Sequence, residues 1–186
     1  MNTLVLHGSA RRGRDTDRLA AAFLEGMAEV GSHSTTHFYA IDMNIAHCRA
    51  CMRCANGEGC VVQDDMQDVY PALLEADVVV LATPMFWGYM TSQLKTLFDR
   101  LEAVVSEKYF GSKDFVLLIG YRGYHGSMVE WLERITGFVN SRSHAIVCQT
   151  YDPEARIDIP IQETPERLEE ARALGRRIAA ASGGGN

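Results

Sequence analysis

Four of the five cysteines in the chain lie within one short stretch, as Cys48, Cys51, Cys54 and Cys60. Thiolates this close together can wrap a four-iron, four-sulfur cluster, and glycines before the last cysteine let the chain turn back to supply it. A zinc-binding interaction domain is a second interpretation, although the spacing is tighter than that of paired zinc knuckles. A third is that the thiols are structural, reduced or partly disulfide-bonded.

A second chemical feature is the polar loop from Gly8 to Thr16, which contains Ser9, Arg11 and Thr16 and precedes an amphipathic segment. Hydroxyls and arginines at the amino end of a helix favour an anion, because free N–H groups and the helix dipole both attract negative charge. The dinucleotide spacing G-x-G-x-x-G and the G-K-[ST] ending of a P-loop are absent. The loop therefore predicts a site for a mononucleotide phosphate; the alternative is an ordinary polar turn capped by Thr16 or Asp15.

A third feature is the aromatic loop that follows the apolar run Val78 to Leu81. Its candidate ligand-binding residues are Pro84, Met85, Phe86, Trp87 and Gly88. A further loop after residues 115–119 offers Tyr121, Arg122 and Gly123. Flat rings and exposed backbone suit a tricyclic isoalloxazine, so the phosphate loop and the aromatic loop together suggest FMN. The alternative is a hydrophobic plug under a surface loop.

Apolar runs that lack alternation predict the buried parallel strands that would position these loops. We expect strands at 3–7, 34–40, 78–81, 115–119 and 145–150, alternating with amphipathic helices. This pattern predicts a doubly wound five-stranded parallel sheet in the order 2-1-3-4-5, with helices on both faces. In that order the loops after strands one, three and four meet where the strand order reverses. We expect one domain over residues 1–182 and a flexible tail at 183–186.

Composition narrows the classes of partner. The net charge of −6 and the pI near 5.5 argue against nucleic acid. The chain starts without a charged signal-peptide segment, and its apolar runs are too short to span a bilayer. We therefore expect a cytoplasmic protein that acts on small molecules.

Several of these motifs together resemble the flavodoxin-like NAD(P)H-dependent FMN reductase family, especially its iron-sulfur flavoprotein branch. The residues that carry the resemblance are Gly8-Ser9-Ala10-Arg11 with Thr16, Thr83 to Gly88, Gln93-Leu94-Lys95 with Asp99-Arg100, and the cysteine segment ending in Asp64-Asp65-Met66. The resemblance implies that Ser9, Arg11 and Thr16 contact the FMN phosphate and that Pro84 to Gly88 run along the flavin. Asp15 departs from the neutral residue common in the family and is left out of the site, since a carboxylate would repel the phosphate.

The same resemblance implies a homodimer or homotetramer that passes electrons from NAD(P)H through FMN to a quinone, a flavin or another small acceptor. It also implies that Cys48, Cys51, Cys54 and Cys60 could hold a 4Fe-4S cluster. The main alternatives are an iron-sulfur flavoprotein or a flavodoxin-type electron carrier between protein partners. The absence of acidic residues from Met85 to Met90 and from Gly120 to Gly126 argues against the carrier.

Overall fold

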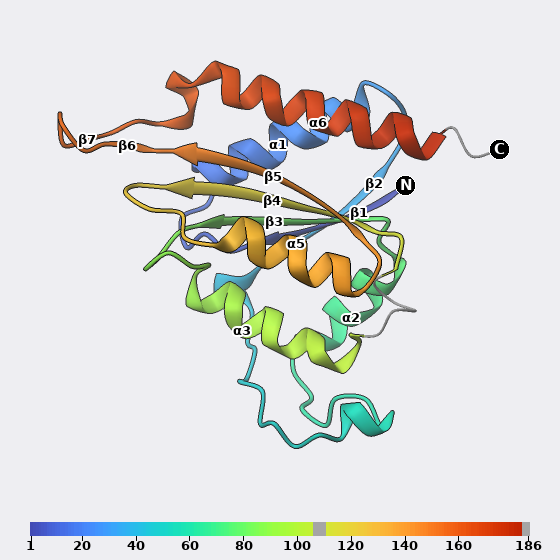
Figure 1. Ribbon diagram of the computed structural model, residues 1–186. Helices are drawn as coiled ribbons and strands as arrows, with labels where there is room; N and C mark the ends of the chain where they lie inside the picture. Colours follow the sequence, from blue (N-terminus) through green and yellow to red (C-terminus); the bar gives the residue numbers. More distant parts are fainter. Residues whose placement is uncertain (106–110, 184–186) are drawn as a thin grey trace.

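The computed structural model describes residues 1–105 and 111–183. Its centre is a five-stranded parallel sheet in the order β2-β1-β3-β4-β5, which confirms the predicted order (Figure 1). The strands are β1 (Asn2–His7), β2 (Ser34–Tyr39), β3 (Val78–Pro84), β4 (Asp114–Tyr121) and β5 (Arg142–Gln149). β1, β3 and β4 carry nearly continuous buried runs, because helices cover both of their faces.

Helices pack on the sheet in two layers (Figure 1). One face carries α1 (Asp15–Ala28) and α6 (Pro165–Gly183), and the other carries α2 (Met66–Glu75), α3 (Ser92–Arg100) and α5 (Met128–Phe138). Alternate residues of each central strand enter opposite cores: Leu117 packs with the layer of α2, α3 and α5, whereas Val116 packs with α1 and α6. This two-layer burial fixes the register that places the loop-bearing ends of the strands together.

The α1–α6 contact is close because each helix places a glycine against the backbone of the other. A Cβ added at Gly26 would lie 2.0 Å from the carbonyl oxygen of Arg172, and one at Gly175 would lie 2.1 Å from that of Phe23. The backbones of the two helices therefore touch at these positions.

The structure adds an element that the sequence did not predict. A short antiparallel hairpin, β6 (Tyr151–Asp152) with β7 (Ile157–Asp158), follows β5 and extends past the carboxyl edge of the sheet (Figure 1). β3 also continues to Pro84 rather than ending at Leu81. At the end of the chain, α6 includes Gly183, and the rest of the predicted tail lies outside the described residues. Within the described ranges, no helix is long and apolar enough to cross a membrane.

Candidate functional site

A cleft of about 290 Å³ opens at the carboxyl edge of the sheet, where β1, β3 and β4 end. Its walls come from the loop after β1, the start of α1, the loop after β3, the end of β4 and the segment after β7. In a doubly wound sheet this is the place where ligands bind. The residues around the cleft are Ser9, Arg11, Arg14, Asp15, Thr16, Arg18, Pro84, Met85, Phe86, Gly120, Arg122, Thr150, Asp158, Ile159, Pro160 and Gln162.

One end of the cleft is suited to an anion. Arg11, Arg14 and Arg18 line it beside the first turn of α1, whose leading N–H groups have no partners within the helix. Ser9 is buried, and its Oγ both donates to the Arg11 carbonyl at 2.9 Å and accepts from the Arg11 N–H at 3.1 Å. This small turn fixes the direction of the loop as it leaves β1.

The loop is anchored underneath by Thr91, the N-cap residue of α3. Thr91 Oγ1 donates to the Gly8 carbonyl at 2.7 Å and accepts from the Leu94 N–H at 3.4 Å. One buried hydroxyl thus ties the loop after β1 to the helix that follows the aromatic loop.

The two carboxylates in the first turn of α1 bind protein donors. Asp15 Oδ1 accepts from the Ile161 N–H at 2.9 Å. Asp17 contacts His7 Nδ1 at 2.8 Å with one oxygen and accepts from the Gly13 N–H at 2.7 Å with the other. Asp15 therefore lines the cleft with one oxygen already engaged, and α1 is capped by neither Asp15 nor Thr16, since its N-cap residue is Arg14, without a side-chain capping bond.

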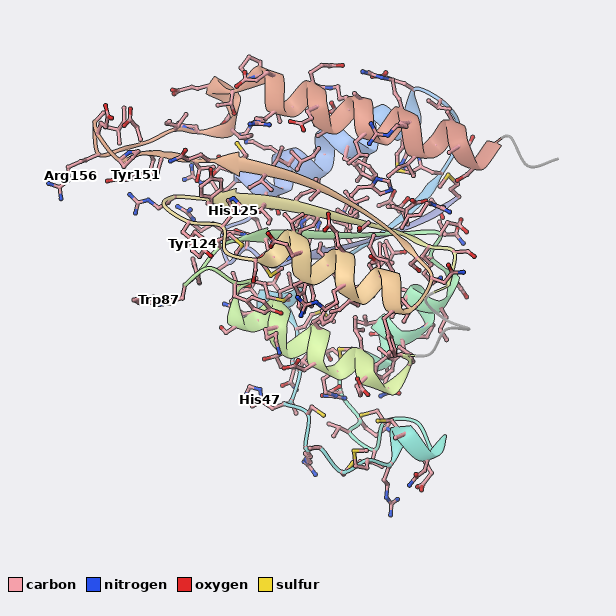
Figure 2. The ribbon with its side chains drawn as sticks, in the orientation of Figure 1. His47, Trp87, Tyr124, His125, Tyr151 and Arg156 are labelled. Atoms are coloured by element: carbon pink, nitrogen blue, oxygen red, sulfur yellow. The ribbon has the colours of Figure 1, made fainter. Side chains whose placement is uncertain are left out.

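The aromatic loop is a tight turn between Phe86 and Tyr89, which exchange two backbone hydrogen bonds of 2.9 and 3.1 Å. Both residues at its tip have positive φ, 54° for Trp87 and 75° for Gly88. This geometry turns the Trp87 side chain fully into solvent, at the outer end of the loop (Figure 2). Pro84, Met85 and Phe86 line the cleft, but Trp87 and Gly88 do not.

The third loop reaches the cleft through one predicted residue, Arg122. Its Nε lies 3.2 Å from Asp158 Oδ1, and its guanidinium stacks 4.0 Å from the centre of the Tyr151 ring, so the hairpin β6–β7 holds it (Figure 2 labels Tyr151). Tyr121 and Gly123 are absent from the lining. Tyr121 instead packs its ring edge-on against His125, with 5.2 Å between centroids.

Of the predicted cofactor-binding residues, the structure gathers Ser9, Arg11, Thr16, Pro84, Met85, Phe86 and Arg122 around one cleft. Sequence reasoning missed Arg14, Arg18 and the wall formed by Thr150 and residues 158–162. Arg14 and Arg18 could have been found from their place beside the helix start. The far wall carries no recognisable motif, because it depends on a hairpin whose strands are two residues long.

The cysteine segment lies apart from this cleft, beyond the layer of α2 and α3 (Figure 1). Its four cysteines surround a small cavity of about 60 Å³, together with Arg100 from the end of α3. All four are free thiols. Among the described residues, no three His, Cys, Asp or Glu side chains are grouped closely enough to hold a metal ion. The four sulfurs thus share one cavity without converging on a point.

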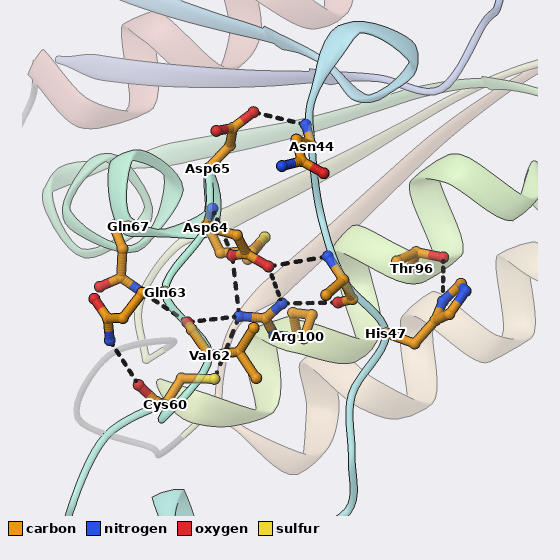
Figure 3. A network of polar contacts seen from close by, with 12 residues as sticks. Asn44, His47, Cys60, Val62, Gln63, Asp64, Asp65, Gln67, Thr96 and Arg100 are labelled. Carbon is orange, nitrogen blue, oxygen red and sulfur yellow. Dashed lines mark hydrogen bonds and ion pairs between the residues drawn. The ribbon is translucent and has the colours of Figure 1, made fainter.

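Both ends of the cysteine segment are joined through an almost fully buried ion pair between Arg100 and Asp64 (Figure 3). The guanidinium donates to Asp64 at 2.6 and 3.1 Å, to the Ala46 carbonyl at 2.7 Å and to the Val62 carbonyl at 3.2 Å. It also donates to Cys60 Sγ at 3.3 Å. Burial alone would raise the pKa of Cys60, but the Val62 backbone, Tyr70 and Arg100 lower it below the ordinary value.

The chain is similar in sequence to two iron-sulfur flavoproteins. An iron-sulfur flavoprotein of Methanosarcina thermophila is 34% identical over 111 residues, which cover 60% of this chain and 57% of that protein. An iron-sulfur flavoprotein of Archaeoglobus fulgidus is 29% identical over 189 residues and covers 97% of this chain and 80% of that protein. The match to the Methanosarcina protein thus spans little more than half of its length.

Two solved structures share the fold. The NAD(P)H:quinone oxidoreductase of Methanothermobacter marburgensis has a TM-score of 0.70 at 19% identity, covering 96% of both chains. An FMN-dependent NADH-azoreductase of Bacillus anthracis has a TM-score of 0.69 at 14% identity, covering 96% of this chain and all of that one. Residues 1–152 match the model of the NADPH-dependent FMN reductase family. Since this match includes the whole parallel sheet and every loop around the cleft up to Thr150, the chain belongs to that family.

Proposed function

We propose that the cleft binds FMN and that the protein is an oxidoreductase that transfers electrons from NAD(P)H to a small acceptor, such as a quinone or a flavin. The observation that carries the proposal is one cleft with an anion-binding end and an apolar end. The start of α1, with Ser9, Arg11 and Arg14, suits a phosphate. Pro84, Met85 and Phe86 offer an apolar wall. Family membership supports the same assignment.

When bound, FMN supplies the hydride and electron chemistry, and the chain supplies binding and orientation. Gly120 lets the end of β4 approach α1, because a Cβ there would already lie 3.4 Å from Thr16 Cγ2. Arg122, held by Asp158, places a positive charge at the rim of the cleft. Trp87 and Tyr124 extend into solvent beyond the cleft (Figure 2). The roles of Trp87, Gly88, Tyr121 and Gly123 stay predictions.

The phosphate end is tested by comparing FMN with riboflavin, which lacks the phosphate. Arg11→Gln should weaken FMN binding by about 1.5–3 kcal/mol, the scale of a charge-assisted hydrogen bond, and leave riboflavin binding unchanged. Arg134→Gln, which changes an exposed arginine on α5, is the matched control. Fluorescence titration of the apoprotein measures both ligands. Equal losses for FMN and riboflavin, or no FMN binding by the wild type, would contradict the assignment.

Anaerobic mixing of the FMN-loaded protein with excess NADH and, in a second experiment, with NADPH distinguishes an enzyme from an electron carrier. We expect at least one of them to bleach the flavin absorbance, followed by steady-state turnover with a quinone or free FMN. Flavin that stays oxidised with both nucleotides would favour a flavodoxin-type carrier. Light scattering during gel filtration tests the predicted homodimer or homotetramer.

A second candidate function is that the cysteine segment holds a 4Fe-4S cluster, which would make the protein an iron-sulfur flavoprotein. The observation in its favour is that four thiols and a buried guanidinium line one cavity, a donor set suited to an anionic thiolate-bound group. Since no three of these side chains, among the described residues, are grouped closely enough to hold a metal ion, binding would have to draw the sulfurs together. Anaerobic purification should give about four irons and four sulfides per chain, lost in Cys51→Ser. Absence of iron under these conditions would contradict this function and leave the FMN assignment intact.

A further inference from the structure

The cysteine segment is chemically uneven, and the cause is Arg100. Cys48 and Cys51 are exposed, whereas Cys60 is partly buried and receives a hydrogen bond from the guanidinium at 3.3 Å. Cys48, Cys51 and Cys54 have no such contact with Arg100, whose hydrogen bonds go to Ala46, Cys60, Val62, Asp64 and Tyr70 within the described part of the chain. One sulfur is thus held in place before any ligand arrives.

The side chain that holds this sulfur is itself rigidly placed. Arg100 is 2% exposed, and Asp64 binds it through both carboxylate oxygens. Asp64 also accepts from the Ala46 N–H at 2.9 Å and the Met66 N–H at 3.2 Å. The pair therefore fixes the entry to the segment at Ala46 and its exit at Cys60 to Asp64, as Figure 3 shows. Planar, bidentate pairing of this kind sets direction as well as energy.

The part of the segment between these fixed ends has an unfavourable backbone conformation. It contains two non-glycine residues in the left-handed region, Ala50 with φ 49° and Met52 with φ 61°, besides Gly57 and Gly59. Left-handed backbone is unfavourable for Ala and Met, so this conformation is one that bound metal could readily replace.

Arg100 also retains an unused donor. Its Nε is buried and has no hydrogen-bond partner among the described residues. Buried donors are almost always paired, so an unpaired one in a residue that lines a cavity calls for an explanation. A bound group rich in sulfur acceptors, placed in the same cavity, would give this Nε–H a hydrogen-bond acceptor.

We propose that Arg100 is the positioning residue of the cysteine segment: it holds Cys60 as the fixed sulfur ligand, and Cys48, Cys51 and Cys54 close onto it when a soft, thiolate-bound metal group is bound. This inference rests on the second candidate function and deepens it. Hydrogen bonds from partners behind the ligands orient metal sites, and hydrogen bonds to sulfur set the potential of iron-sulfur clusters.

The first test measures the affinity of the reduced, anaerobic protein for Cd²⁺, a soft metal probe. Binding is monitored by the cadmium–thiolate charge-transfer absorbance while a chelator competes for the metal. Arg100→Lys keeps the charge but loses the planar fork, and should weaken Cd²⁺ binding about tenfold or more. Arg53→Gln is the matched control, because it removes a cation of the same segment whose partner is Glu58 at 3.3 Å and not a sulfur. It should change Cd²⁺ affinity less than about twofold, and Cys60→Ser should cost more affinity than Cys48→Ser.

The second test is the midpoint potential of the iron-sulfur protein after anaerobic reconstitution. Removing an N–H···S hydrogen bond destabilises the more negative, reduced state, so Arg100→Lys should have a lower potential than the wild type and Arg53→Gln an unchanged one. A role in folding alone would not move the potential of the protein that does fold.

FMN titration and far-ultraviolet circular dichroism check that each variant is folded. If Arg100→Lys fails this check, Asp64→Asn replaces it, because it removes the charge that fixes the guanidinium and substitutes no cysteine. Equal Cd²⁺ affinity and equal potential in the folded variant and the wild type would overturn the role of Arg100, as would losses in Arg53→Gln of the same size. Wild-type protein that binds FMN but no Cd²⁺ would overturn it together with the cluster, and leave the FMN assignment standing.

Discussion

Replacement of Thr91 by Val tests the anchor between the loop after β1 and helix α3. The Thr91 hydroxyl makes two contacts, a donated bond of 2.7 Å to the Gly8 carbonyl and an accepted bond of 3.4 Å from the Leu94 N–H. Thr91 is 1% exposed, and Gly8 is buried beside it, so water cannot replace the lost donor. Val keeps the shape of the side chain and removes only the hydroxyl chemistry.

The two contacts contribute unequally. Leaving the buried Gly8 carbonyl unsatisfied costs about 1–3 kcal/mol. Losing the N-cap bond costs about 1 kcal/mol, and its 3.4 Å length favours the lower part of the usual range. We therefore expect Thr91→Val to lower the free energy of unfolding by about 2–4 kcal/mol, a large share of the ~5–15 kcal/mol typical of a domain.

Urea unfolding of the apoprotein at neutral pH measures this change, since bound FMN would add its own stabilisation. The midpoint should fall while the m-value stays constant. Thr91→Ser, which retains the hydroxyl, should recover most of the loss, and Ser92→Ala at the exposed neighbour should stay within about 0.5 kcal/mol of the wild type. The proposed anchor is refuted if Thr91→Val is as stable as the wild type, or if Thr91→Ser is destabilised as much as Thr91→Val.

Three further changes test other parts of the structure. Burial alone would raise the pKa of Asp114, but hydrogen bonds from Arg142 and His144 lower it from 3.8 to about 2. The ionised carboxylate therefore contributes about 2 kcal/mol to the free energy of unfolding above pH 4, and this contribution is lost between pH 4 and 2. Asp114→Asn should be less stable at pH 7 and lose less stability on acidification than the wild type, and an unchanged dependence of stability on pH would contradict the pairing. Gly126→Ala should destabilise the protein by about 1–3 kcal/mol in thermal unfolding, because φ is 62° and the new Cβ would lie 1.9 Å from the Gly88 carbonyl oxygen. Gly123→Ala, where a Cβ would meet nothing within 4 Å, should leave the melting temperature unchanged. Gly26→Ala should force α1 and α6 apart and lower the free energy of unfolding in urea by about 1–3 kcal/mol. Gly31→Ala, where a Cβ would meet nothing within 4 Å, should leave it unchanged. Similar losses in the two variants would disprove the close helix contact.

Local sequence patterns determined the sheet and part of the cleft. The unbroken apolar run from Val78 to Leu81 requires cover on both faces, and right-handed crossovers then leave few strand orders. That order places the loops of Ser9 and Met85 at one edge, and both residues line the cleft. These predictions succeeded because periodicity and turn composition are properties of neighbouring residues.

Tertiary packing decided the features that join residues far apart in the chain. The composition of the aromatic loop did not reveal that its tip is a tight turn, which points the Trp87 side chain into solvent. The far wall at Asp158 depends on a hairpin too short to leave a periodic signal. Arg100 resembles an ordinary charged residue at a helix end, and it becomes the centre of a buried network only because α3 packs against Ala46, Cys60 and Asp64, 36 to 54 positions earlier. Burial of a charge is set by what covers it, and a local pattern does not contain that information.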